Sequence, residues 1–220
     1  MGKATLFILL TGLTLLAGCG KPQGEARRVI VQTPAGPLIG IAGAGDFRFG
    51  NIPYAVALSA WKTPRDAGQP GAACPADPAS SEACRTLDIR APAGRTKAPV
   101  LVWLGEAEDP LFDEQALARS GVIAVVVHDH AQGVSALLDQ EAALVWLRSN
   151  IASFGGDTAN IVVLGDVAAL AEAPEARGLF ARALAPAARN ANAVAARTCW
   201  LSVAASGAAT CPPESGWRLL

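Results

Sequence analysis

Three apolar runs separated by helix-like segments constrain the fold of this chain more than any other feature. The runs are APVLVWLG (98–105), SGVIAVVVHD (120–129) and NIVVLG (160–165), and they are rich in β-branched residues. Runs that are apolar at nearly every position are typical of strands buried on both faces of a parallel sheet. The order strand, helix, strand, helix, strand therefore predicts an α/β fold with a mostly parallel sheet flanked by helices.

The two segments between these runs carry helical signals. PLFDEQALARSG (110–121) fits a helix that ends at Gly121, and the segment 136–156 ends at a glycine pair suited to a left-handed C-cap. The longer segment also has an apolar stripe of the kind that a helix turns toward a core. Its members are Leu138, Ala142, Val145, Trp146 and Ala152.

The remaining segments complete one domain rather than two. The chain has 220 residues, of which 51% are hydrophobic, which is enough for one sizeable core. VIVQTPAGPLIGIAG (29–43) predicts an opening β-hairpin, the Pro- and Gly-rich stretch 46–83 predicts mostly loop, and RTLDIRAP predicts a further strand. The formal net charge is −1 and the arginines are scattered, so we expect no nucleic-acid partner.

The N-terminus has the pattern of a bacterial lipoprotein signal. An early Lys3 precedes an apolar run from Leu6 to Ala17, which is shorter than the roughly 20 residues needed to cross a bilayer. The sequence Leu-Ala-Gly-Cys that ends at Cys19 resembles a lipoprotein box, in which cleavage precedes a lipidated cysteine. An ordinary secretory signal is the alternative. We expect residues 1–18 to be a signal peptide and 19–28 a polar tether that attaches the protein to a membrane, with Gly20 favouring the outer membrane.

Four cysteines remain after Cys19, in two pairs that are close in sequence: Cys74 with Cys84, and Cys199 with Cys211. An even number in an exported protein predicts two short-loop disulfides. Zinc is the rival interpretation, but the chain has no C-x-x-C spacing and only two histidines. We therefore expect no metal and no cofactor.

Read in order, these and neighbouring segments resemble the N-terminal part of the type-B carboxylesterases, the cholinesterase-like branch of the α/β-hydrolase fold. The matching pieces are TPAGPLIGI, FGNIPYA, WKTPRDA, SEACRTLDIRAP, APVLVWL, LLDQEAALVWLRSNIASFGGDTANIVVLGD and GLFARALA. The string NIASFGGDTANIVVLG is highly specific to that family, and the resemblance covers about residues 29–185. It implies an α/β-hydrolase fold, here truncated, and places Cys74 and Cys84 at the family's first disulfide.

The resemblance also locates the nucleophile elbow, whose pattern is G-x-S-x-G because a strained turn lifts the serine above the sheet. The five positions here are Gly165, Asp166, Val167, Ala168 and Ala169. Val167 stands at the serine position and has no atom that can attack a carbonyl. A β-branched residue tolerates the strained backbone poorly, at about 1 to 3 kcal/mol, so we expect Val167 to have an ordinary negative φ.

The oxyanion loop departs from the family in the same way. The family follows this strand with a histidine and a run of glycines, whose N–H groups receive the negative charge of the intermediate. The residues here are Gly105, Glu106, Ala107 and Glu108. A carboxylate about 5 Å from a developing oxyanion costs roughly 3 kcal/mol at an effective dielectric near 20.

The family's acid and histidine follow its serine at a distance, whereas this chain ends soon after GLFARALA. His128 and His130 precede the elbow, so the resemblance gives them no catalytic role. We expect them to be solvated or hydrogen-bonded surface groups at a strand end. The acidic residues from Glu106 to Glu114 predict favourable helix-dipole chemistry at Asp113 and Glu114 rather than a calcium site.

These observations predict a lipid-anchored cell-envelope protein whose carboxylesterase-like domain (29–190) is catalytically inactive and serves in binding. A sheet that ends early needs a cover, and the tail 191–220 with its predicted disulfide or a protein partner would provide one. The alternative is a carboxylic-ester hydrolase that another chain completes or that uses a site foreign to the family. A gene fragment without function is a third interpretation.

Overall fold

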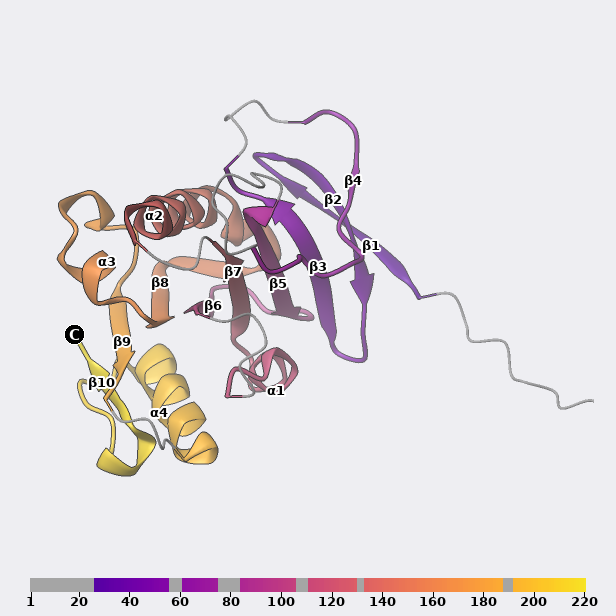
Figure 1. Cartoon of the computed structure of the whole chain (residues 1–220). Helices are drawn as coiled ribbons and strands as arrows, with labels where there is room; N and C mark the ends of the chain where they lie inside the picture. The colour runs from indigo at the N-terminus through magenta and orange to yellow at the C-terminus, as the bar shows by residue number, and fades with distance from the viewer. Residues whose placement is uncertain (1–25, 56–60, 75–83, 106–110, 130–132, 188–191) are drawn as a thin grey trace, which may run out of the picture.

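The computed structural model describes residues 26–55, 61–74, 84–105, 111–129, 133–187 and 192–220, and within them ten strands form one sheet (Figure 1). The strand order is β1-β2-β3-β5-β7-β6-β8-β9-β10, with β4 beside β2. The strands are β1 (Arg28–Thr33), β2 (Gly36–Ala42), β3 (Asp46–Pro53), β4 (Arg65–Asp66), β5 (Thr86–Pro92), β6 (Ala98–Leu104), β7 (Ile123–His128), β8 (Gly156–Gly165), β9 (Arg182–Pro186) and β10 (Trp217–Leu219). The helices are α1 (Glu114–Arg119), α2 (Gly133–Asn150), α3 (Ala168–Glu172) and α4 (Ala193–Ser206), with 3₁₀ turns η2 (Ile151–Phe154), η3 (Pro174–Ala176) and η4 (Pro213–Ser215).

The predicted α/β class and the opening hairpin are confirmed, and the sheet is mixed. Its centre, β7-β6-β8-β9, is parallel, whereas β1, β2, β3, β5 and β7 pair in antiparallel fashion, as do β9 and β10. Parallel neighbours need a crossover, which α1, α2 and α3 supply, while the short turns that join β1 to β2 and β2 to β3 give antiparallel pairs. The prediction of a mostly parallel sheet therefore holds for the centre alone.

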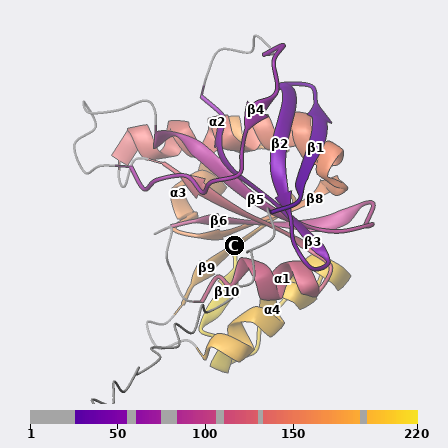
Figure 2. The same ribbon diagram turned by 90° about the vertical axis from the view of Figure 1, so that its right-hand side faces the viewer.

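Helices cover both faces of the central strands (Figure 2). Because side chains alternate along a strand, Val100, Val102 and Leu104 of β6 face the core under α2 and α3. Leu101 and Trp103 face a second core under α1 and α4. This alternation decides on which side of the sheet each functional position lies.

Strand β3 lies in the stretch that the sequence predicted to be mostly loop, so that prediction is wrong for residues 46–53. Phe49 and Ile52 are fully buried on this strand. Between them the pairing register with β5 shifts, and Asn51 takes a positive φ of 54°. The irregularity breaks the apolar alternation that would have revealed the strand.

Three of the five members of the apolar stripe that we predicted for the segment 136–156 do not face the core, and one of them, Ala152, is exposed in η2 after the end of α2. Leu138 and Val145 are exposed, with 59% and 45% of their surface accessible. The helix instead packs through Ala143, Leu144 and Leu147. Apolar residues occur nearly all round α2, so their spacing does not single out the buried face.

The C-terminal segment extends the sheet instead of only covering its edge. Helix α4 packs Trp200 against the second core, and β10 pairs antiparallel with β9 (Figure 1). The disulfide Cys199–Cys211 joins α4 to the stretch that leads into β10. As a result, β9 has a neighbour on each side, β8 and β10.

Candidate functional site

The turn after β8 keeps the glycine that an elbow needs. Gly165 has a φ of 118°, and a Cβ atom at this position would lie 2.0 Å from the carbonyl oxygen of Leu104 on β6. That separation is far below van der Waals contact, and the backbone region is one that glycine alone enters without strain. The chain thus retains the close approach of β8 to β6 that the family's first elbow glycine permits.

Val167, at the nucleophile position, is folded into the core. Its side chain is fully buried beside Leu170, and its backbone has φ −112° and ψ 8°. The predicted negative φ is confirmed. The Val167 N–H donates to Gly165 O at 3.0 Å, and Val167 O accepts from the Ala171 N–H at 2.9 Å. The turn has therefore relaxed into the start of α3 and presents no reactive atom to solvent.

The other elbow positions carry no replacement nucleophile. Asp166, Ala168 and Ala169 are exposed, and the Asp166 N–H donates to Leu104 O at 3.1 Å. Helix α3 ends at Glu172, so the element that follows the turn is five residues long. A solvated carboxylate at Asp166 is a weak nucleophile, and nothing in the elbow itself would activate it.

Of the oxyanion loop, the described residues include only the first, Gly105. Gly105 is exposed and directly follows Leu104, which pairs with Gly165. The elbow turn and the start of the loop are therefore neighbours at the carboxyl ends of β6 and β8. Glu106, Ala107 and Glu108 lie outside the described residues, so their effect on an oxyanion stays a prediction.

His128 is buried, which corrects our expectation of a surface histidine. Its Nε2 lies 3.4 Å from Asp88 Oδ2, and neither ring nitrogen has a hydrogen-bond partner within the described part of the chain. Gly71 packs so closely that a Cβ there would lie 2.7 Å from the imidazole Cδ2. The loop that carries Gly71 thus removes His128 from water, which a strand-end pattern alone could not indicate. His130 lies outside the described residues.

Asp88 fastens two loops to the sheet. Its Oδ1 accepts the backbone N–H groups of Asn51 and Gly71, both at 2.8 Å, and its Oδ2 accepts from Gly71 at 3.1 Å. Asp88 holds Asn51 at the irregularity of β3 and Gly71 over His128. The sequence did not predict a role for Asp88, because the groups it binds are backbone N–H groups, and no side-chain motif indicates them.

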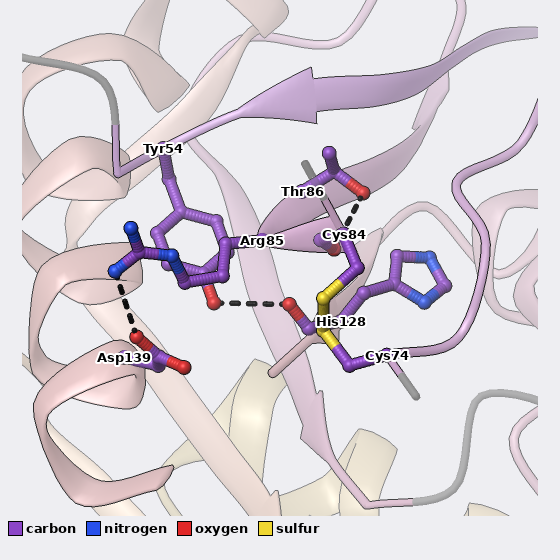
Figure 3. The surroundings of a disulfide bond; sticks show 7 residues. All are labelled: Tyr54, Cys74, Cys84, Arg85, Thr86, His128 and Asp139. Atoms are coloured by element: carbon purple, nitrogen blue, oxygen red, sulfur yellow. Dashed lines mark hydrogen bonds and ion pairs between the residues drawn. A yellow bond between two sulfur atoms is a disulfide. The ribbon is translucent and has the colours of Figure 1, made fainter. Parts of the chain in front are cut away.

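A second polar group lies beside the disulfide Cys74–Cys84 (Figure 3). The buried Tyr54 hydroxyl donates to the His128 carbonyl oxygen at 2.9 Å. Burial raises the pKa of Tyr54, and the Asp139 and Asp129 carboxylates raise it further, so the phenol stays protonated and remains a donor. Arg85 pairs with Asp139 of α2 at 3.3 Å. These contacts join the disulfide region to β7 and α2.

The acidic residues at the start of α1 act as predicted. Asp113 is the N-cap and accepts the Ala116 N–H at 2.9 Å, while Glu114 lies in the first turn. Burial raises the pKa of Glu114, with Asp88 as the next cause. In the described ranges no three His, Cys, Asp or Glu side chains come together as metal ligands. Glu106, Glu108 and Asp109 lie outside those ranges.

The sheet separates the elbow from the histidine. Val127 faces the core under α2, so its neighbour His128 faces the opposite side, where it lies across from Thr86 of β5. Val167 packs on the α2 side. A nucleophile and its base must lie within hydrogen-bond reach of each other. His128 therefore cannot serve a residue at the Val167 position.

The parallel centre, the crossover helices and the strand–turn–helix at Gly165 define a domain of the α/β-hydrolase class. The Carboxylesterase family model matches residues 40–207. Para-nitrobenzyl esterase of Bacillus subtilis (strain 168) is 31% identical over 208 residues, covering 70% of this chain and 42% of that protein. Phenmedipham hydrolase of Pseudarthrobacter oxydans is 30% identical, with 71% and 42% covered. The chain belongs to the carboxylesterase family, as the resemblance predicted.

Solved structures agree with this assignment. A carboxylesterase of Geobacillus stearothermophilus superposes with a TM-score of 0.62 at 30% identity, covering 79% of this chain and 48% of that one. A thermophilic para-nitrobenzyl esterase superposes with a TM-score of 0.61, covering 70% and 43%. The chain thus spans less than half the length of these relatives.

Proposed function

We propose that this chain is a catalytically inactive carboxylesterase-family domain that is held in the cell envelope by a lipid on Cys19 and acts there in binding. The observation that carries the proposal is Val167, a fully buried residue without a nucleophilic atom at the family's serine position. Loss of a triad nucleophile alone lowers the rate of acyl transfer by several orders of magnitude.

Two further features support inactivity. The loop after β6 reads Gly-Glu-Ala-Glu where the family has glycines, and carboxylates there oppose the charge of a tetrahedral intermediate. His128 lies on the other side of the sheet from the elbow. Each feature removes a different part of the machinery, so restoring the serine would not restore the site.

The alternative is an ester hydrolase completed by a second polypeptide. A second polypeptide that continued the sheet beyond β9 would meet β10 of this chain, which occupies that edge through pairs such as Arg218 with Ala185. A completing chain would have to displace β10 or pair with its outer edge. A protein partner at that outer edge fits a binding role better than a catalytic one.

The envelope location is supported by the sequence around Cys19. The lipoprotein box predicts attachment to a membrane through an N-terminal lipid, and Gly20 favours the outer membrane, facing the periplasm or the surface. Of the helices in the described residues, none is long and apolar enough to cross a membrane. Intact-mass analysis of protein from the native membrane tests the anchor. A mature chain that begins at an acylated Cys19 is expected, and an unmodified N-terminus would contradict it.

Hydrolysis of 4-nitrophenyl acetate and butyrate tests inactivity. The mature chain, a Val167→Ala variant and a His128→Ala variant are compared at equal concentration, with para-nitrobenzyl esterase of Bacillus subtilis as the positive control. All three forms of this chain are expected to match the blank. Turnover that one of these substitutions abolishes would overturn the proposal, because it would assign a catalytic residue.

A further inference from the structure

The face of the N-terminal hairpin that points away from the core carries three isoleucines. Ile30 of β1 lies directly opposite Ile39 of β2, and Ile41 follows two residues along β2. Their sequence neighbours Val31 and Leu38 pack into the core, so alternation turns the isoleucines outward. Ile30 is 57% exposed, and Ile39 and Ile41 are half-buried. One exposed and two partly exposed isoleucines side by side form an apolar patch that can enter a contact.

A row of arginines crosses the same face. Arg28 of β1 is opposite Ile41, Ile41 is opposite Arg48 of β3, and Arg48 is opposite Arg90 of β5. Residues directly opposite each other in antiparallel strands share one face of a sheet. Arg28 and Arg48, both exposed, therefore flank the isoleucines. Asp66 lies beside Ile39 and pairs with Arg28 at 2.7 Å, and Arg90 pairs with Asp46 at 2.6 Å.

The hairpin is also the part of the domain nearest to the proposed lipid. Arg28 follows Cys19 by nine residues. Nine residues reach at most about 30 Å even when fully extended. Strand β1 forms one end of the sheet and β10 the other (Figure 1). A short tether therefore keeps the β1 end close to the bilayer, whichever way the remainder of the domain turns.

We propose that this hairpin face, defined by Ile30, Ile39, Ile41, Arg28 and Arg48, rests on a phospholipid surface that contains anionic headgroups. The isoleucines enter the interface, and the guanidinium groups pair with phosphates. The inference rests on the proposed lipidation of Cys19, which brings the face to the membrane. Helices α1 and α4 pack on this same face of the sheet farther along it, and α2 and α3 cover the opposite face. Docking of the hairpin therefore turns the face covered by α2 and α3 away from the bilayer.

Depth-dependent quenching tests the contact in the full lipidated chain. A fluorescent thiol label is placed at Gln32→Cys, on the same outward face, or at Ala171→Cys as the matched control, because Ala171 is exposed on α3 and α3 covers the opposite face of the sheet. The four cysteines of the domain are paired as disulfides, so the introduced thiol is the free one once Cys19 is acylated. The protein is reconstituted in vesicles of three parts phosphatidylethanolamine to one part phosphatidylglycerol that carry a headgroup nitroxide.

Quenching at position 32 is expected to exceed quenching at position 171 about threefold, and Ile30→Asp is expected to remove the difference. Replacing phosphatidylglycerol with phosphatidylcholine, or Arg48 with Gln, is expected to reduce it. Intact mass first establishes acylation of Cys19. An acylated protein with equal quenching at both positions overturns the docking proposal and leaves the anchor in place. Concentration-dependent self-quenching at position 32 without nitroxide quenching also overturns it, in favour of a second copy of this chain. An unacylated Cys19 overturns the anchor itself.

Discussion

The two faces of the central sheet bury different kinds of side chain. On the α2 side, the turn at the end of β8 has become apolar, with Val167 buried among core residues and its backbone hydrogen-bonded. On the α1 side, Asp88 and His128 are buried on β5 and β7, and neither imidazole nitrogen of His128 has a hydrogen-bond partner in the described residues. The comparison shows that the position of the family's nucleophile is part of the apolar core on one side, whereas on the other side a buried carboxylate holds backbone N–H groups.

Asp88→Ala is expected to have the largest effect on the polar side. It leaves the N–H groups of Asn51 and Gly71 without their acceptor and removes the charge beside His128, so we expect a loss of about 3 to 5 kcal/mol in the free energy of unfolding. Urea denaturation with both disulfides kept oxidised measures this free energy. Asp66→Ala, at a fully exposed carboxylate, serves as the control, and a much smaller loss of stability is expected for it. Equal losses for the two variants would contradict the anchoring role of Asp88.

Gly165→Ala is expected to be the most damaging single change at the elbow. The added Cβ meets the Leu104 carbonyl and forces a residue with a side chain into positive φ, for a loss of about 3 kcal/mol or more. Gly178→Ala is the matched control, because Gly178 has a φ of 79° with open space around its missing Cβ. That variant should lose only about 1 kcal/mol. A Gly165→Ala protein as stable as the control would show that β8 and β6 separate easily here.

Val167→Ser tests whether position 167 belongs to the apolar core or to a catalytic site that lacks only its serine. The substitution removes buried methyl groups and introduces a hydroxyl among apolar side chains, so we expect a loss of about 2 kcal/mol and no esterase activity. Thermal and urea unfolding measure the first effect, and 4-nitrophenyl acetate hydrolysis the second. Val167→Ala separates lost packing from the buried hydroxyl. Unchanged stability together with new turnover would show that the site needs only its serine.

Glu114→Gln is expected to have the smallest effect, and one that depends on pH. Burial raises the pKa of Glu114 in the folded protein above its unfolded value, so folding favours the protonated form. The stability of the native chain relative to the variant is therefore full below about pH 4 and falls as pH rises through the folded pKa. The Gln variant should equal the native chain in acid and exceed it at neutral pH. A difference of the opposite sign would mean that Arg90 and Arg48 outweigh the burial of Glu114.

Much of the fold could be predicted, because its strands and turns carry local signals. The runs at β6, β7 and β8 are apolar throughout, and the string from Asn150 to Gly165 is specific to one family. The β3 strand was missed where Asn51 breaks its alternation, and the buried face of α2 was mistaken because Leu138 and Val145 are apolar and exposed. Strand β10 was missed as well, since three residues carry no usable period.

The site could be predicted only where a motif defines it. The pattern around Val167 predicted both the lost nucleophile and its negative φ, because backbone strain depends on residue type. The burial of His128 depends on Gly71, which is distant in sequence and carries no side chain to signal the contact. Asp88 depends in the same way on two backbone groups. Such contacts form only when the chain has folded.

Covalent labelling tests most directly whether the elbow at Val167 lacks an activated nucleophile. A fluorophosphonate phosphonylates an activated serine of a hydrolase, and intact mass followed by peptide mapping detects the adduct. We expect no adduct on the mature chain or on its Val167→Ser variant, while para-nitrobenzyl esterase of Bacillus subtilis is labelled under the same conditions. A stoichiometric adduct on the mature chain, or on the introduced serine of the variant, would contradict it.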